Sequence, residues 1–588
     1  MKTKLHEEKQ VINDINLEIP KRILSKFSKL IRESGSDDEK IAASYLTSYL
    51  EEWEVPHQVH YPKLYLSVPK DSSLQISHPI EKNIRAKVPS FSKATEKQCS
   101  GEIVYIQSKK ASKIEDIFSG GLIEHDEDSL KDKIVLTEGY PMPGQVSTFQ
   151  ESNAKAAIFI SPGQRIHEGI CTPVWGSPDL DSMDNEPHIP VLSISKEDGE
   201  LLKKICEQDT AHIKFETNLD KGWFDCPLID IFIPGTVETD KYVLLHGHLD
   251  SWHEGIGDNA TGNAALLEIA RVLHKNKDKI KRSIRIAIWP GHSTGRYAGS
   301  TWFADQYALD LDENCIAQVN CDSPGCRWAT SYSNINWMSE ADEFCKKAIK
   351  DVVGQDSSGS RPRRSGDYSF NNIGITSYYK LSSTMPDELI KEKGYHPVGG
   401  CGGNIEWHTE DDLLHIVDYD ILKKDIELYL VSVFRVLNKP IYPFNYVNTI
   451  DEIINTIQQY QQESGSHFNF DLALHEAEQL KQSLTEFYQN IEYLKGESIT
   501  DIDVQKQNNK LLKLGRILIT MNYSRSGKFR QDPALEVPPL PDIAPALTLQ
   551  KLQPDSHLYN VTKNHLTRGQ NRIIFSLRKV KEILKTSN

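Results

Sequence analysis

The apolar positions of the chain change their spacing several times, and each change predicts a different kind of structure. Residues 10–55 repeat apolar side chains at intervals of three and four, which is the spacing of amphipathic helices. The next stretch holds short β-rich runs such as GEIVYI, DKIVLTEG and AAIFISPG. We therefore expect an N-terminal helical part at residues 1–60 and a β-rich domain at residues 61–230.

The following stretch alternates buried strands with amphipathic helices. YVLLHGHLD, SIRIAIWPG and IAQVNCDSPG have the composition of buried strands, while NAALLEIARVLHKN and AGSTWFADQYAL have helical periodicity. This alternation predicts an α/β domain at residues 231–440, with a sheet covered on both faces. The Gln-, Glu- and Leu-rich periodicity that follows predicts a helical domain at residues 441–588.

Several of the predicted strands end in imidazole or carboxylate side chains. His248 and Asp250 lie two residues apart after the first strand, Asp258 precedes a helix, Asp322 ends a later strand, and His408 lies in a loop. An imidazole there can bind a metal, and a neighbouring carboxylate can fix its tautomer. Taken singly, such residues more often satisfy loop backbone. Their recurrence at one sheet edge, where ligands of α/β folds bind, favours a metal site.

Charge and cysteine content narrow the function classes. The chain has 68 Lys and Arg against 83 Asp and Glu, a formal net charge of −15, which argues against nucleic-acid binding. Nine cysteines are dispersed without a CxxC pair, and the charged N-terminus lacks the apolar core of a signal peptide. No apolar run approaches the length of a membrane span. We expect a cytoplasmic protein with reduced thiols and no membrane or nucleic-acid partner.

The sequence HGHLDSW…GDNATGNAALLEIARVL resembles the signature of the co-catalytic zinc aminopeptidases. This family includes glutamate carboxypeptidase and its non-catalytic relative, the transferrin receptor. The segments SIRIAIWPGHSTGRYAGSTWFAD, VNCDSPG and WHTEDDLLHIVDYDIL resemble further family segments in the same order. The resemblance implies a zinc-exopeptidase-like α/β/α sandwich, an inserted β-rich protease-associated domain and a C-terminal helical domain that pairs two chains into a homodimer.

The resemblance also implies roles for individual residues. His248, Asp258 and Asp322 match the ligands of one zinc ion, and Asp258 and His408 match ligands of the other, with Asp258 bridging the two. Asp250 matches the acid that orients the first histidine. A bridged metal pair of this kind polarises a carbonyl group and activates water.

The sequence departs from the family at its most consequential position. The family has a Glu-Glu pair, a general base followed by a ligand of the second zinc, where this chain has His292 and Ser293. Because serine is a poor zinc ligand, we expect one divalent cation, zinc, rather than two. His292 has three open interpretations: a replacement ligand, a base, or a hydrogen-bonded loop residue.

Two further loops are candidates for contact with a substrate. The segment SGSRPRRSGDYSF is rich in arginine, which can clamp a substrate carboxylate, although a solvated basic loop is an equal alternative. A Gly-rich loop follows it, and the loop of His292 also carries an arginine. The candidate substrate-binding residues are Arg296, Arg363, Arg364, Asp367, Tyr368 and His396.

Three hypotheses on function follow. The first is a metal-dependent hydrolase of the aminopeptidase or carboxypeptidase type, acting on a peptide-like or small amide substrate with His292 in place of the glutamate base. The second is a metal-dependent lyase or other non-peptidase enzyme on the same fold, and the third is a non-catalytic binding protein. The retained metal-ligand pattern argues against the third hypothesis, and the family resemblance favours the first.

Overall fold

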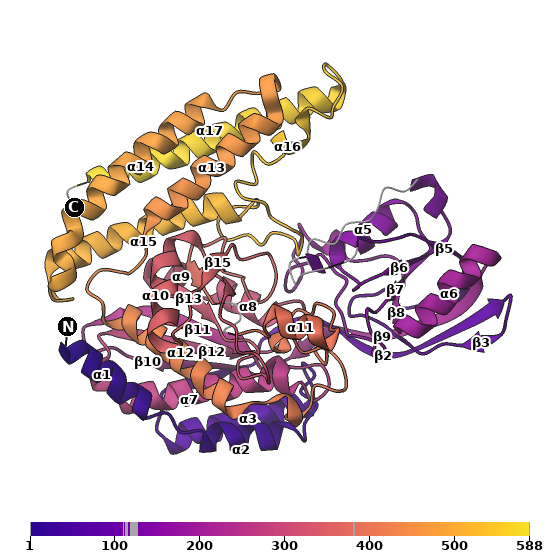
Figure 1. Cartoon of the computed structure of the whole chain (residues 1–588), viewed down its shortest axis with the longest axis horizontal. Helices are drawn as coiled ribbons and strands as arrows, with labels where there is room; N and C mark the ends of the chain where they lie inside the picture. Colours follow the sequence, from indigo (N-terminus) through magenta and orange to yellow (C-terminus); the bar gives the residue numbers. More distant parts are fainter. Residues whose placement is uncertain (1, 110, 112–115, 118–126, 380–382, 587–588) are drawn as a thin grey trace.

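The central sheet organises the α/β domain (Figure 1). The computed structural model describes residues 2–109, 111, 116–117, 127–379 and 383–586. Within them, β11 runs parallel to its neighbours β12 and β13, whereas β1 and β10 are antiparallel additions at one edge. In spatial order, the strands of this sheet are β1 (His57–His60), β10 (Leu228–Ile233), β12 (Arg282–Trp289), β11 (Glu238–His248), β13 (Cys315–Asn320) and β16 (Thr376–Tyr378).

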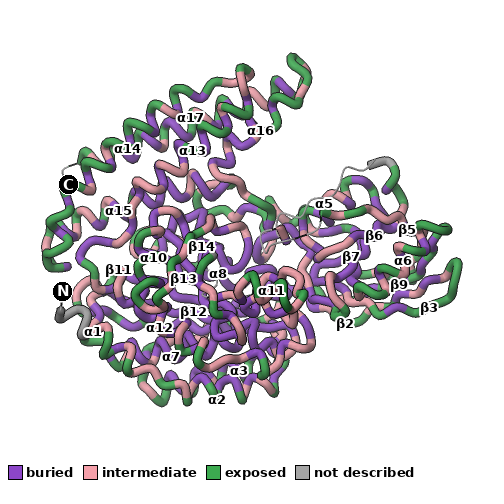
Figure 2. The backbone as a smooth tube through the Cα atoms, in the orientation of Figure 1, coloured by how far each residue is buried: buried purple, intermediate pink, exposed green. Residues whose placement is uncertain are grey.

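Helices cover both faces of this sheet. The apolar residues of one face share a hydrophobic core with several helices, and those of the other face pack against different ones. Figure 2 shows the sheet as buried along most of its length. The predicted α/β/α sandwich is therefore confirmed. The first face is covered by α1 (Lys2–Asn13), α2 (Glu18–Phe27), α3 (Asp37–Glu52), α7 (Thr261–Lys275), α10 (Asp342–Val352) and α12 (Tyr419–Asn438), and the second by α8 (Ala298–Gln306) and α9 (Ala308–Asn314).

Local sequence explains where these helices begin. The Ser36 hydroxyl caps α3 by accepting a hydrogen bond from the Glu39 N–H at 3.1 Å, and three acidic residues occupy the first turn. Helix α7 is buried along almost all of its length, from Thr261 to Leu273, because it lies between the sheet and α2 and α12. The helical periodicity predicted for residues 10–55 is thus found in α2 and α3.

A second sheet forms the β-rich domain, drawn in violet and purple in Figure 1. Its long strands β2 and β9 pair antiparallel, and β5 to β8 are parallel. The helices α5 (Pro143–Glu151) and α6 (Lys196–Gln208) pack against it, and it has hydrophobic cores of its own. Its strands are β3 (Lys82–Asn83), β2 (Lys63–His78), β9 (His212–Asp225), β5 (Cys99–Tyr105), β6 (Ile134–Glu138), β7 (Ala156–Ile160), β8 (Val191–Ile194) and β4 (Ala86–Lys87).

The C-terminal part is helical, as predicted, and a buried arginine provides one of its contacts with the α/β domain. Arg516 donates hydrogen bonds to the carbonyl oxygens of Gly374, Leu311 and Cys315 at 2.6–3.0 Å, so that one guanidinium joins the two domains. Pairing of two chains through these helices remains a prediction. The helices are α13 (Tyr446–Ser464), α14 (Asp471–Ile491), α15 (Ile502–Tyr523), α16 (Ala546–Leu549) and α17 (His557–Lys585).

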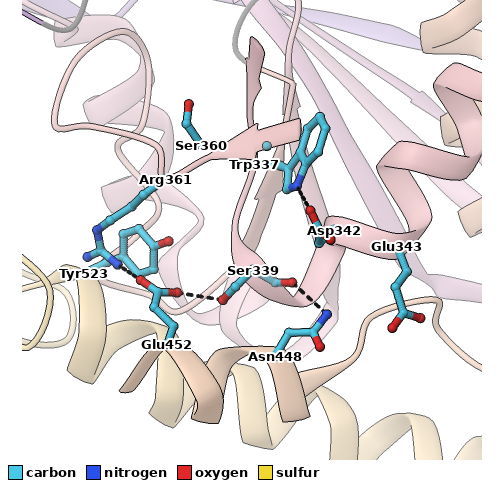
Figure 3. Close-up of a pocket in the computed structure, with 10 residues that line it drawn as sticks. Trp337, Ser339, Asp342, Glu343, Ser360, Arg361, Asn448, Glu452 and Tyr523 are labelled. Carbon is cyan, nitrogen blue, oxygen red and sulfur yellow. Dashed lines mark hydrogen bonds and ion pairs between the residues drawn. The ribbon is translucent and has the colours of Figure 1, made fainter. Parts of the chain in front are cut away.

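The seam between these two domains contains a polar surface pocket of about 440 Å³ (Figure 3). Arg361 pairs with Glu452 at 2.5 Å, Ser339 donates to Glu452 at 2.7 Å, and Trp337 donates to Asp342 at 3.0 Å. Since these polar groups satisfy one another, the pocket wall serves as an interdomain contact.

Glu340 lies buried in the same seam and makes stability depend on pH. Its carboxyl oxygens accept hydrogen bonds from the hydroxyls of Thr376 at 2.9 Å and Thr449 at 3.0 Å. Burial raises the pKa of Glu340 to about 7 from an ordinary value of 4.5. The folded protein therefore keeps a proton between pH 4.5 and 7 that the unfolded chain has already lost. The contribution of Glu340 to the unfolding free energy must fall as the pH rises through this range.

We predict that Glu340→Gln removes this pH dependence. The pKa difference corresponds to about 3 kcal/mol, at about 1.4 kcal/mol per pKa unit. On going from pH 5 to pH 8, the urea midpoint of the wild type should fall further than that of the variant. Glu343→Gln, an exposed change in the same seam, should behave as the wild type. If the urea midpoints of all three proteins change with pH in parallel, Glu340 is not the source of the pH dependence.

Candidate metal centre

Three adjacent parallel strands bring the predicted ligands together. His248 is the last residue of β11 and pairs in register with Trp289 of β12, and the chain after Trp289 leads to His292. On the other side, β13 ends at Asn320, two residues before Asp322. Since the carboxyl ends of parallel strands share one sheet edge, the three side chains converge there. Donor atoms of His248, His292 and Asp322 lie within 4.8 Å of one another.

Asp258 lies between two imidazoles at the centre of this group. Its Oδ1 atom is 2.9 Å from Nε2 of His248, and its Oδ2 atom is 3.1 Å from Nε2 of His408. Asp322 Oδ1 lies 3.9 Å from the same nitrogen of His248. All four side chains are buried or nearly so. The geometry thus brings together the four residues that the sequence predicted as metal ligands.

The other ring nitrogens of both histidines face backbone acceptors. Nδ1 of His248 lies 2.8 Å from the carbonyl oxygen of Asp250, and Nδ1 of His408 lies 3.1 Å from that of Glu168. A carbonyl oxygen can only accept, so each Nδ1 carries the hydrogen. In the neutral rings, Nε2 is then a lone pair directed at the carboxylate of Asp258. Two electron-rich atoms in such contact require a cation or a proton between them.

Buried atoms without hydrogen-bond partners indicate that a metal ion fits here. Nε2 of His248 and Oδ1 of Asp258 have no hydrogen-bond partner of correct geometry, although they lie close together and are shielded from solvent. In the protein alone, burial opposes protonation of His248, but Asp258 and Asp322 outweigh it and raise its pKa to about 10. A divalent cation supplies the same positive charge, and imidazole with carboxylate is a donor set that suits zinc.

The loop that carries Asp258 is itself held by a buried carboxylate. Asp412 accepts hydrogen bonds from the backbone N–H groups of Gly257 at 2.7 Å and of Asp258 at 3.0 Å. Burial, with a contribution from the nearby charge of Asp258, raises the pKa of Asp412 to about 7. These two hydrogen bonds fix the backbone from which the Asp258 side chain reaches both imidazoles.

The two acceptor groups of Asp250 contact different residues, which the sequence did not indicate. Its backbone carbonyl, rather than its carboxylate, receives the Nδ1 hydrogen of His248. The carboxylate accepts hydrogen bonds from the backbone N–H of His292 at 3.1 Å and of Ser293 at 2.8 Å. Asp250 therefore joins the loop after β11 to the loop after β12.

His292 forms a buried pair with Asp367. Its Nδ1 atom lies 2.8 Å from Oδ2 of Asp367, which leaves Nε2 as the free ring nitrogen. The ring stacks on that of His248, with centroids 3.8 Å apart and planes inclined by 10°. Burial opposes ionisation of Asp367, but His292 outweighs it and lowers the pKa of this carboxyl to about 2. The sequence grouped Asp367 with substrate-binding residues, whereas here its partner is the histidine.

The arginine-rich loop has contacts in the C-terminal region. Arg364 is buried, donates to the backbone oxygen of Asp532 at 2.6 Å, and places its guanidinium carbon 3.6 Å from the ring centre of Trp175. Arg363 lies 3.9 Å from Glu536, and Tyr368 is fully buried. These three side chains are therefore engaged within the fold, and a role in substrate binding stays a prediction for each.

The two remaining candidates contact the β-rich domain. Arg296 donates to the backbone oxygen of Ile170, and Nε2 of His396 lies 3.1 Å from Nε2 of His167. Their predicted role in substrate binding stays a prediction as well. The sequence reasoning missed Glu168, whose backbone contacts His408. No motif signals that contact, because the two residues are 240 positions apart.

Comparisons with known proteins identify the α/β domain. Residues 231–431 match the model of Peptidase family M28. Aminopeptidase NAALADL1 of Mus musculus is 40% identical over 94 residues, which are 15% of this chain and 12% of that protein. Transferrin receptor protein 1 of Gallus gallus is 29% identical over 163 residues, 24% of this chain and 21% of that protein.

The sequence of a plant protein aligns with a longer part of this chain. Probable glutamate carboxypeptidase LAMP1 of Arabidopsis thaliana is 23% identical over 383 residues, 59% of this chain and 54% of that protein. The chain thus spans about half the length of this relative, and much less of the other two. The resemblance stated from the sequence is confirmed.

Solved structures show the same fold. The aminopeptidase from Aneurinibacillus sp. strain AM-1 matches with a TM-score of 0.53 at 17% identity, covering 73% of this chain and 95% of that chain. The zinc aminopeptidase BSAP from Bacillus subtilis matches with a TM-score of 0.52 at 18% identity, covering 71% of this chain and 95% of that chain. In the described part of this chain, no helix has the length and apolar character needed to cross a membrane.

We predict that zinc stabilises the folded protein through His248. A cation that binds only the folded state raises its melting temperature, and removal of one ligand weakens that binding. Thermal unfolding should therefore shift upward when zinc is added to the chelator-treated wild type, and the shift should disappear in His248→Ala. His212→Ala, an exposed change in β9, should keep it. An equal shift in all three proteins would place the zinc elsewhere.

Proposed function

We propose that this protein is a metal-dependent hydrolase that cleaves an amide bond in a peptide or a small peptide-like substrate. One observation carries this proposal. Nδ1 of His248 faces a backbone carbonyl oxygen, so that its Nε2 faces the carboxylates of Asp258 and Asp322. Metal-binding histidines are typically held in this way. The M28 assignment of residues 231–431 supports hydrolysis as the reaction class.

We assign one tightly bound divalent cation, zinc, to His248, Asp258 and Asp322. Three protein ligands with an open position are typical of catalytic zinc sites. A second cation beyond Asp258 would have only Asp258 and His408 as imidazole or carboxylate ligands among the residues predicted from the sequence. The bound cation would polarise the substrate carbonyl and make water more acidic.

We assign His292 to proton transfer rather than to metal binding. The lone pair of an imidazole nitrogen lies in the ring plane, so two histidines that share one ion need planes that intersect at the ion. The rings of His292 and His248 are nearly parallel and stacked 3.8 Å apart, so their lone pairs run side by side. His292 therefore stands beside the cation position with Nε2 available as a base.

The proposed reaction uses His292 twice. Its Nε2 takes a proton from the attacking water while the water oxygen bonds to the amide carbon, and the same proton passes to the leaving nitrogen as the C–N bond breaks. Asp367 stabilises the imidazolium form between these steps because its carboxylate faces the Nδ1 hydrogen at 2.8 Å. The backbone hydrogen bonds from His292 and Ser293 to Asp250 hold the loop in place.

We predict that His292→Ala and Asp367→Asn lower kcat by about 100-fold or more, since a positioned acid–base group typically contributes that much. Zinc affinity, measured by chelator competition, should stay close to that of the wild type in both variants, and KM should change little. The assay uses a panel of aminoacyl and N-acyl amides. Asp356→Asn, an exposed change in the same domain, is the control.

The results distinguish a base from a metal ligand at position 292, and a hydrolase from a lyase. If His292→Ala loses zinc, His292 is a ligand and its assignment as a base is wrong. If the zinc-loaded wild type cleaves no amide in the panel, the hydrolase proposal is not supported. If product formed in ¹⁸O-labelled water carries no label, the reaction is not hydrolysis, and the lyase hypothesis gains instead.

A further inference from the structure

The β-rich domain reaches the metal centre through the backbone of one residue. Glu168 lies in the loop between β7 and β8, and its N–H donates to the carbonyl oxygen of His408 at 2.8 Å. In return, Nδ1 of His408 donates to the carbonyl oxygen of Glu168 at 3.1 Å. The indole of Trp407 stacks on the imidazole of His408 at 3.8 Å. A residue of another domain thus fixes both the position and the tautomer of His408.

Ion pairs across the domain boundary hold Glu168 in this position. Its carboxylate lies 2.8 Å from Nζ of Lys87 and 3.0 Å from Nε2 of His253, and Lys87 also lies 2.9 Å from Glu410. Lys87 and Glu168 belong to the β-rich domain, whereas His253 and Glu410 belong to the α/β domain. We call these four residues the interdomain clasp.

Because Lys87 and Glu168 are nearly buried, breaking their ion pair costs more than breaking one at the surface. The side chains of Lys87 and Glu168 are only 12% and 9% exposed. Exposed pairs contribute little because water and salt screen them, whereas a buried charge that loses its partner is left uncompensated. Removal of Lys87 would leave the two carboxylates of Glu168 and Glu410 without their shared cation. The loop that carries Glu168 should then move away from His408.

We propose that docking of the β-rich domain and binding of the metal ion are thermodynamically coupled through the interdomain clasp and His408. This inference rests on the proposed function, because it assumes that a cation binds beside Asp258. The chain of contacts runs from Lys87 to Glu168, then to His408 and Asp258. By linkage, whatever loosens the clasp lowers the affinity for the cation, and the bound cation tightens the contact by the same factor.

The first test is zinc affinity in Lys87→Met, a substitution that keeps the length of the side chain and removes its charge. We expect weaker binding in chelator competition, by up to about tenfold. Loss of a direct partner of a metal ligand typically costs 10- to 100-fold, and Lys87 acts on the ligand Asp258 only through Glu168 and His408. The control is Lys82→Met, which removes a lysine that pairs with Asp198 inside the β-rich domain. The control should bind zinc as the wild type does.

The second test needs no variant. In the wild type, zinc should slow the exchange of amide hydrogens in residues 162–176, which contain Glu168, and leave residues 212–225 of the same domain unchanged. Equal zinc affinity in Lys87→Met and the wild type overturns the coupling, and so does exchange in 162–176 that zinc does not alter. If Lys87→Met does not fold, the exchange measurement alone decides. A wild type that binds no zinc overturns instead the cation of the proposed function.

Discussion

The carboxylate of Asp258, held between two imidazoles, is the interaction on which the rest of the site depends. A buried carboxylate is costly unless positive charge or hydrogen bonds compensate it. His248 and His408 face its two oxygens at 2.9 and 3.1 Å. Each imidazole is in turn held by a carbonyl oxygen at its other nitrogen. The loop geometry, the tautomers of the two histidines and the choice of donor atoms all serve to compensate the negative charge of the buried Asp258 carboxylate.

This requirement explains why the centre is assembled from distant parts of the chain. The Nδ1 atom of each of the three histidine rings faces a hydrogen-bond acceptor, and these acceptors come from three different segments of the chain. His248 takes its acceptor from its own loop, His292 takes Asp367 from 75 positions away, and His408 takes the backbone of Glu168 from the β-rich domain. The β-rich domain is therefore part of the wall of the centre as well as an insertion beside it.

The fold and the convergence of His248 and Asp322 at one sheet edge could be predicted because both follow from local pattern. His248 and Asp322 lie at fixed short offsets from strands whose apolar runs are evident, and parallel strands bring their carboxyl ends together. The partners of these residues could not be predicted, since Asp367 and Glu168 reach the site by loop packing that leaves no periodic signal. The contacts of the arginine-rich loop could not be predicted for the same reason: Arg364 faces Trp175 and the backbone of Asp532, which only the folded chain brings near.

In the proposed centre, His292 and Ser293 stand where the family pattern has a glutamate pair, and this difference affects its charge as well as its base. In the pattern that this sequence resembles, two further carboxylates stand beside the ligands and accompany a second cation. Here Asp258 and Asp322 remain as carboxylates beside His248, and the single divalent ion that we propose would balance them. Asp250 is satisfied by two backbone N–H groups, and Asp367 by His292. In this proposal, one ion leaves the contact between Asp258 and His408 to a proton. The imidazole of His292, which is paired with Asp367, takes up a further proton beside that ion.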